Sequence, residues 1–283
     1  MRQTDVVNPL IEVAELAVAL ASARPPTLID VRWTLKGDGA QAYAAGHLPG
    51  AAFVDLDTAL AGPPGAGGRH PLPEPAVLQE ALRAAGVDAG RPVVVYDAGG
   101  TPPTGAAARA WWVLRWAGHP DVRILDGGYA AWTADGRPVT DDRVEPAPGG
   151  FTVAPDHEPV IDAGAAAAFA VDGRLLDARV PARYRGEQEP VDPVAGHIPG
   201  ALNQPAAYTV DDNGRLLDAG TLRERFEALG LEPDEGPVGA YCGSGVTAAQ
   251  TVLALTVAGY TPVLYVGSWS DWITDENRPI DKA

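Results

Sequence analysis

Sulfur-containing side chains are nearly absent from this sequence, whose 283 residues include one cysteine and one methionine. A single cysteine excludes an intramolecular disulfide, and it excludes zinc or iron–sulfur sites that need several thiolates. In a reducing compartment, a lone cysteine is either a small buried side chain or a working thiol. Packing is the commoner outcome for this residue type. The sequence around Cys242 therefore has to decide its role.

Positive charge is also scarce, because 21 Lys and Arg against 37 Asp and Glu give a formal net charge of -16. Binding to nucleic acid phosphates needs a basic surface, which excludes nucleic acid as a partner. No apolar run approaches the roughly 20 residues that span a bilayer, and no secretory signal is recognisable. We therefore expect a cytoplasmic protein without a membrane partner. An anionic substrate would have to be attracted by local arginines.

What the sequence does contain is an internal repeat. Asp-x-Arg occurs at residues 30–32 and again at residues 177–179, and Gly-His-[Leu/Ile]-Pro-Gly-Ala occurs at residues 46–51 and 196–201. Further matches follow in the same order: residues 93–96 with 238–241, and residues 125–132 with 264–272. The offset is nearly constant and far longer than the period of a solenoid repeat. The sequence therefore predicts two copies of one domain.

Each half alternates short apolar runs with helix-like stretches. Residues 93–96, 122–125 and 262–266 suit buried strands, and residues 76–85, 106–117, 221–229 and 246–258 suit helices. This alternation predicts an α/β fold in which each half is a parallel sheet flanked by helices. Residues 141–157, rich in proline and glycine, are typical of a linker. We predict a first domain over residues 1–140 and a second over residues 158–283.

The apolar run at residues 238–241 leads directly into Cys242, and Gly243 and Gly245 follow before a helix begins near Val246. In a parallel α/β fold, this places the cysteine at the carboxyl end of a strand, where ligands usually bind. Both glycines permit positive φ, which would turn backbone N–H groups toward the sulfur beside a helix N-terminus. This cradle would stabilise a thiolate or a persulfide. The pattern predicts a nucleophile at Cys242, the alternative being a buried side chain in a tight turn.

The segment Cys-Gly-Ser-Gly-Val-Thr-Ala at residues 242–248 resembles the active loop of the rhodanese superfamily, particularly its mercaptopyruvate sulfurtransferase branch. The repeated Asp-x-Arg and Gly-His motifs are similar to that superfamily's domain signatures. Residues 69–73 and 125–132 resemble first-domain segments of its tandem members. The resemblance implies two tandem rhodanese-like domains, of which only the second is catalytic. In the first half, Asp97 matches Cys242, and a carboxylate cannot carry sulfane sulfur.

The resemblance also implies roles for individual residues. The catalytic set would be Cys242, with Ser244, His47 and Asp38 assisting proton movement. The substrate-binding set would be Arg183, Arg185, Gly243, Gly245, Val246 and Thr247. Arginine suits this task because its planar fork binds a carboxylate or sulfonate through two hydrogen bonds. No metal and no organic cofactor is implied, since the cysteine itself carries the sulfur. His197, which repeats His47 in the second half, is interpreted as structural.

Two departures from the family pattern bear on the sulfur donor. Mercaptopyruvate sulfurtransferases commonly have a second arginine in a Glu-Pro-Arg segment, and Val191 stands in that place here. Thiosulfate-preferring rhodaneses carry a basic pair after the cysteine, where this chain has Gly243 and Ser244. Losing two nearby cations weakens the binding of a compact dianion. The residues closest to the sulfur therefore favour 3-mercaptopyruvate over thiosulfate.

The predicted function is transfer of sulfane sulfur from a small anionic donor, through a Cys242 persulfide, to cyanide, a thiol or thioredoxin. The alternative is a persulfide relay or sulfur-carrier module that turns over no small donor, and the sequence leaves it open. A phosphatase with the same fold would need a Cys-x5-Arg loop. Ala248 occupies the place of that arginine, which argues against a phosphatase.

Overall fold

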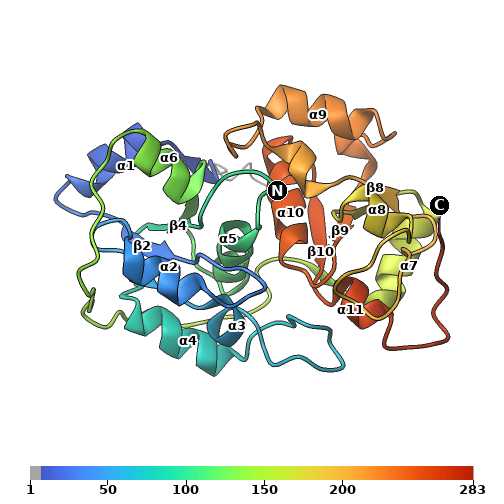
Figure 1. The fold of residues 1–283 in the computed structure, drawn as a ribbon, viewed down its shortest axis with the longest axis horizontal. Helices are drawn as coiled ribbons and strands as arrows, with labels where there is room; N and C mark the ends of the chain where they lie inside the picture. The colour runs from blue at the N-terminus through green and yellow to red at the C-terminus, as the bar shows by residue number, and fades with distance from the viewer. Residues whose placement is uncertain (1–7, 283) are drawn as a thin grey trace.

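The computed structural model describes residues 8–282, and within them it contains two parallel sheets of five strands each. The first sheet has the strand order β1-β5-β4-β2-β3 and the second has β6-β10-β9-β7-β8, so both have the same topology. Figure 1 shows the first unit in blue to green and the second in yellow to red, with helices flanking each sheet. The predicted duplication and α/β class are confirmed. Residues 1–7 of the predicted first domain, and Ala283 at the end of the second, lie outside the described residues.

Both units are built from the same succession of short elements. The first contains β1 (Leu10–Ile11), α1 (Val13–Leu20), β2 (Thr27–Asp30), α2 (Gly39–Ala45), β3 (Ala52–Phe53), α3 (Leu56–Ala59), α4 (Pro75–Ala84), β4 (Val93–Tyr96), α5 (Ala106–Trp116), β5 (Val122–Leu125) and α6 (Gly128–Ala134). The second contains β6 (Val160–Ile161), α7 (Ala163–Val171), β7 (Leu175–Asp177), α8 (Pro181–Tyr184), β8 (Leu202–Asn203), η1 (Ala206–Thr209), α9 (Ala219–Glu227), η2 (Pro233–Glu235), β9 (Val238–Tyr241), α10 (Thr247–Val257), β10 (Pro262–Tyr265) and α11 (Ser268–Trp272).

The predicted elements agree closely with these bounds. β4 and β5 have the predicted limits, and β10 is one residue shorter than predicted. The four predicted helices are α4, α5, α9 and α10, displaced by one or two residues at their ends. The central strands can be predicted from the sequence, because a strand of a parallel sheet is covered on both faces and is therefore continuously apolar. All four residues of β4 and of β9 are buried.

The repeated Asp-x-Arg motif forms the same buried ion pair in each unit. After β2, the guanidinium of Arg32 donates to both carboxylate oxygens of Asp30 and to the carbonyl of Gly46, which opens the Gly-His motif. After β7, Arg179 binds Asp177 and the corresponding glycine carbonyl in the same way. Buried charges are tolerated when they are paired and hydrogen-bonded. The motif thus anchors a turn to the sheet, which explains its presence in both halves.

Residues 141–159 contain no helix or strand, yet they are not detached from the first unit. Phe151 is buried in the core, and its carbonyl accepts a hydrogen bond from Nε of Arg83 on α4. The domain boundaries stay a prediction. Among residues 8–282, no helix combines the length and the apolar character needed to cross a membrane.

The two units share a continuous apolar core. α5 and α10 contact each other between the two sheets (Figure 1), and the buried cluster around them includes Trp112, Val246, Ala249 and Cys242. At the beginning of the two helices, a Cβ added to Gly105 would lie 2.8 Å from Cα of Thr247. This close approach places the Cys242 loop at the interface, within reach of side chains from the first unit.

Candidate active site

Cys242 is the residue directly after β9, and its loop leads into α10. Its Sγ atom accepts a hydrogen bond from the backbone N–H of Gly245 at 3.2 Å. Its own N–H donates to Oγ of Ser268, and its carbonyl accepts from the N–H of Trp269. The cysteine backbone is therefore fixed against α11, with the sulfur at the beginning of a helix, where negative charge is stabilised.

The two glycines of this loop are required for different reasons. Gly245 has a φ of +80°, as predicted, and a Cβ there would lie 2.3 Å from the carbonyl oxygen of Val266. Gly243 does not have the predicted positive φ. A Cβ on Gly243 would instead lie 3.2 Å from Nη2 of Arg69 and 3.4 Å from Nη2 of Arg183. Gly243 thus leaves room for two guanidinium groups beside the cysteine.

Gly245→Ala is expected to destabilise the fold more than Gly173→Ala does. Both glycines have positive φ, which costs an L-residue about 1–2 kcal/mol. A Cβ at Gly173 meets no atom within 4 Å, whereas a Cβ at Gly245 meets the Val266 carbonyl. Thermal unfolding midpoints of the two variants test this. Equal midpoints would show that the loop can relax around the added methyl group.

A cavity of about 200 Å³ opens on the cysteine. Cys242, Gly243, Thr247 and Arg183 line it from the second unit. Pro102 and Pro103 line it from the first unit. These prolines belong to the loop after β4, which is the counterpart of the Cys242 loop. The degenerate loop of the first unit therefore forms a wall of the cavity in the second.

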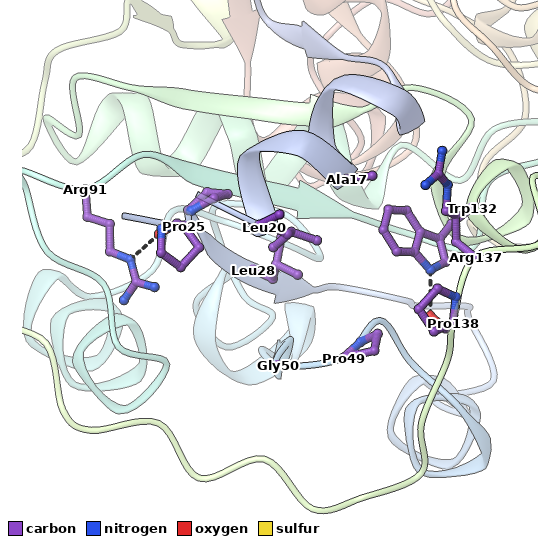
Figure 2. Close-up of a pocket in the computed structure, with 12 residues that line it drawn as sticks. Ala17, Leu20, Pro25, Leu28, Pro49, Gly50, Arg91, Trp132, Arg137 and Pro138 are labelled. Atoms are coloured by element: carbon purple, nitrogen blue, oxygen red, sulfur yellow. Dashed lines mark hydrogen bonds between the residues drawn. The ribbon is translucent and has the colours of Figure 1, made fainter. Parts of the chain in front are cut away.

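A larger cavity, of about 570 Å³, lies in the first unit between α1, β2 and the turn at Pro49 (Figure 2). Its lining is mostly apolar, with Leu20, Leu28 and Trp132, and the Trp132 indole donates to the carbonyl of Pro138. It offers no nucleophile and no acid or base. The smaller cavity is therefore the candidate active site, because Cys242 lines it.

The structure brings only part of the predicted substrate-binding set to this cavity. Arg183 lines it and is paired with Glu189 and Asp192. Although burial alone would raise the pKa of Glu189, Arg183 holds it below its usual range. Arg185 does not line the cavity, and it pairs with Glu187 where both side chains are exposed.

The remaining loop residues contribute mainly through packing and backbone. Val246 is buried in the shared core and does not line the cavity. Thr247 lines it, although its hydroxyl donates to the carbonyl of Thr104 in the first unit. Gly245 acts through its N–H on the sulfur.

His47 and Asp38, predicted to assist proton movement, are not beside Ser244. The His47 ring stacks on Tyr43 with centroids 3.9 Å apart, and its Nδ1 lies 3.0 Å from the Tyr43 carbonyl oxygen. His197 makes the same contacts with its own tyrosine in the second unit. Asp38 is exposed and accepts a hydrogen bond from Thr34 at 2.6 Å. His47 thus has the same environment in the first unit as His197 has in the second, and its described contacts are with Tyr43 rather than with Ser244.

The histidine that lies beside Ser244 is His70. Its Nδ1 lies 2.7 Å from Oγ of Ser244, and its Nε2 lies 3.1 Å from Oδ1 of Asp57. Burial lowers the pKa of His70 to about 4 against the opposing effect of Asp57, and the cations Arg109 and Arg69 lower it further. The ring is therefore neutral at pH 7. If Nε2–H donates to Asp57, Nδ1 is unprotonated and accepts a hydrogen bond from the hydroxyl of Ser244.

The sequence does contain a signal for His70. The Gly-His motif carries a histidine in both halves, whereas His70 has no counterpart in the second half. Repetition in both copies favours a role in the shared fold, and a polar residue found in one copy is the better candidate for a role in the site of the unit that contains the cysteine.

In the first unit, the site equivalent to Cys242 is filled by a carboxylate. Asp97 follows β4, and its oxygens accept hydrogen bonds from the N–H groups of Gly99 and Ala107 and from the hydroxyl of Thr104. The Asp97 carboxylate thus accepts the loop hydrogen bonds at the position that matches Cys242. In the part of the chain that the structure describes, no group of three or more His, Cys, Asp and Glu could hold a metal ion.

Comparison with known proteins agrees with the duplication. A family profile described as a rhodanese-like domain matches residues 12–135 and 162–275. A putative thiosulfate sulfurtransferase, SseB, of Mycobacterium tuberculosis is 46% identical over 281 residues, 97% of each chain. A probable 3-mercaptopyruvate sulfurtransferase of Pseudomonas aeruginosa is 47% identical over 284 residues, 96% of this chain and 97% of that protein. The crystal structure of SseA from Escherichia coli, described as a 3-mercaptopyruvate sulfotransferase, superimposes with a TM-score of 0.79 at 34% identity, covering 93% of this chain and all of that one.

Proposed function

This chain belongs to the rhodanese family, and on that premise we propose that it is a sulfurtransferase whose sulfur carrier is Cys242. One observation carries the proposal. The only cysteine of the chain has its sulfur against a loop N–H, beside a helix N-terminus, in a cavity bounded by Arg183. This arrangement stabilises the thiolate before the reaction and the persulfide after it.

The first half-reaction transfers one sulfur atom. The Cys242 thiolate attacks the sulfur of the donor, an S–S bond forms, and the bond between that sulfur and the rest of the donor breaks. With 3-mercaptopyruvate, the C–S bond breaks, and the carbon takes up the proton that the donor thiol gives up, so that pyruvate leaves. With thiosulfate, the S–S bond breaks and sulfite leaves. In the second half-reaction, an acceptor takes the outer sulfur and the thiolate returns.

The hydrogen-bonded side chains of Ser244, His70 and Asp57 transfer the proton that moves when mercaptopyruvate is the donor. The Ser244 hydroxyl proton moves to neutral His70 as Oγ receives the donor's thiol proton, and it returns from His70 to Oγ as Oγ passes a proton to the carbon. Ser244 and His70 therefore end in the protonation states in which they began. Asp57 orients the imidazole through its other nitrogen. Thiosulfate brings no proton to be moved. This contrast supports 3-mercaptopyruvate over thiosulfate as the preferred donor.

The acceptor is a thiophile: cyanide in an assay, and a thiol or thioredoxin in a cytoplasmic setting. The decisive experiment measures kcat/KM for 3-mercaptopyruvate and for thiosulfate side by side, with cyanide as acceptor. A higher value for 3-mercaptopyruvate supports the proposed donor, and a marked thiosulfate preference contradicts it. Absence of turnover with either donor would favour a persulfide relay module instead.

Arg183→Lys is expected to raise KM for 3-mercaptopyruvate about ten- to a hundred-fold, with a smaller change in kcat. Lysine keeps the charge but loses the planar fork, and a hydrogen bond to a charged group contributes about 1.5–3 kcal/mol. Arg185→Lys is the matched control, because that side chain is exposed and does not line the cavity. Equal effects of the two substitutions would remove Arg183 from the donor site.

A further inference from the structure

We propose that Arg69, contributed by the first unit, is a second donor-binding cation beside Arg183. The inference rests on the proposed function, because it concerns the donor bound at the same cysteine. Sequence comparison with the mercaptopyruvate branch predicts a clamp that lacks one of its two arginines. The structure supplies a second guanidinium from another part of the chain.

Arg69 and Arg183 converge on one point next to the nucleophile. Nη2 of Arg69 and both terminal nitrogens of Arg183 lie within 3.5 Å of where a Cβ of Gly243 would be. Gly243 directly follows Cys242 and lines its cavity. Arg183 lines that cavity, whereas Arg69 is not among its lining residues and reaches it through its contact with Gly243. One cation from each unit thus lies beside the residue that follows the sulfur.

A shared carboxylate holds this pair of like charges together. Oδ1 of Asp192 binds Nη1 of Arg69 at 2.5 Å, and Oδ2 binds Nη2 of Arg183 at 2.9 Å. The Asp192 side chain is only 2% exposed, so its attraction to both guanidiniums is poorly screened. The Arg69 side chain remains 26% exposed. Asp192 therefore fixes the orientation of the two cations without enclosing them.

The position of Arg69 is built into the domain interface. The backbone N–H of Arg69 donates to Oγ of Ser270 on α11, and the preceding Gly68 has a φ of +93°. A Cβ on Gly68 would lie 2.5 Å from the carbonyl oxygen of Gly267. The loop that connects α3 to α4 thus reaches the second unit beside α11 (Figure 1). Arg69 enters the site on a fixed backbone next to His70.

Alkylation of Cys242 tests the proposal without any turnover. Iodoacetate and iodoacetamide both react when the thiolate displaces iodide, but only iodoacetate carries an anionic group. Arg69→Gln is expected to lower the rate with iodoacetate, relative to iodoacetamide, about threefold or more. The single cysteine makes the mass shift unambiguous. Arg185→Gln, which changes an exposed arginine outside the cavity, should leave the ratio unchanged.

Steady-state kinetics and a charge-retaining variant complete the test. Arg69→Gln should raise KM for 3-mercaptopyruvate about tenfold, with a smaller effect on kcat. Arg69→Lys, which keeps the charge, should fall between wild type and Arg69→Gln in the alkylation ratio.

An unchanged alkylation ratio in Arg69→Gln, with an unchanged unfolding midpoint, would overturn the inference. A parallel rise or fall of both alkylation rates would also overturn it, since that pattern reports access to the sulfur rather than charge. The proposed function fails in a different way. If wild type transfers no sulfur from either donor, the function is contradicted while the charge effect on alkylation still stands or falls separately.

Discussion

Cys242→Ser is expected to reduce sulfur transfer from both 3-mercaptopyruvate and thiosulfate at least about a thousand-fold. Serine keeps the size of the side chain and the loop geometry but cannot form a persulfide. No other thiol in the chain can substitute for it. Thiocyanate formation from cyanide measures the loss. Intact mass after incubation with donor and no acceptor should show the gain of one sulfur atom in wild type and none in the variant.

The Cys242→Ser protein provides its own folding control. Cys242 is buried against the shared core, and within residues 8–282 its sulfur accepts a hydrogen bond from the N–H of Gly245. A serine hydroxyl can accept the same hydrogen bond, so the unfolding midpoint should stay close to that of wild type. Retention of transfer by a folded variant would end the assignment of Cys242 as the carrier. A wild-type protein that accepts persulfide sulfur from another protein, yet turns over neither donor, would support the relay alternative.

His70→Asn is expected to lower kcat for 3-mercaptopyruvate about a hundred-fold, while thiosulfate turnover changes only a few-fold. The asparagine amide can keep a hydrogen bond to Ser244, but it cannot take a proton or reach Asp57 as the imidazole does. The proton has to move only with 3-mercaptopyruvate. The ratio of the two kcat values is therefore the diagnostic quantity, because a general structural defect would lower both.

Two controls sharpen the test of His70. His47→Asn removes the histidine that stacks on Tyr43, and it should affect stability without changing the donor ratio. The pH profile is the second control. Because burial lowers the pKa of His70 to about 4, the neutral ring persists down to that pH, and activity dependent on it falls as the pH drops through about 4. An equal loss on both donors in His70→Asn would remove the proton relay from the mechanism.

The parts of the fold that could be predicted are those that local sequence encodes. Buried parallel strands such as β4 and β9 are continuous apolar runs, and α5 and α10 follow them as helical stretches. The duplication can be predicted because the Asp-x-Arg motif occurs in both halves of the sequence. The structure shows that each copy forms the same buried ion pair. Short edge strands such as β1 carry too little periodicity to be recognised in this way.

The candidate site likewise has one part that local sequence encodes and another part that it does not encode. The Cys242 loop is contiguous, so the strand, the glycines and the helix around the nucleophile could be read together. The role of Gly243, in contrast, cannot be predicted from the local sequence. Its φ is not positive, and the reason for a glycine there is the approach of Arg69 and Arg183 from elsewhere in the chain. Similarly, the repeated Gly-His motif predicts a catalytic role for His47, although the recurrence of its contacts at His197 indicates a role in the fold.

Sequence alone determined that the chain is a duplicated α/β protein with one cysteine between a strand and a helix, because strand patterns, repeated motifs and a single cysteine are properties of contiguous residues. Only the tertiary structure decided what surrounds that cysteine. His70 meets Ser244 across a sequence separation of 174 residues, and Arg69 meets Asp192 across 123. No periodicity encodes contacts of that range. They exist because two units pack through α5 and α10, so that side chains of the unit without a cysteine complete the site of the unit that has one.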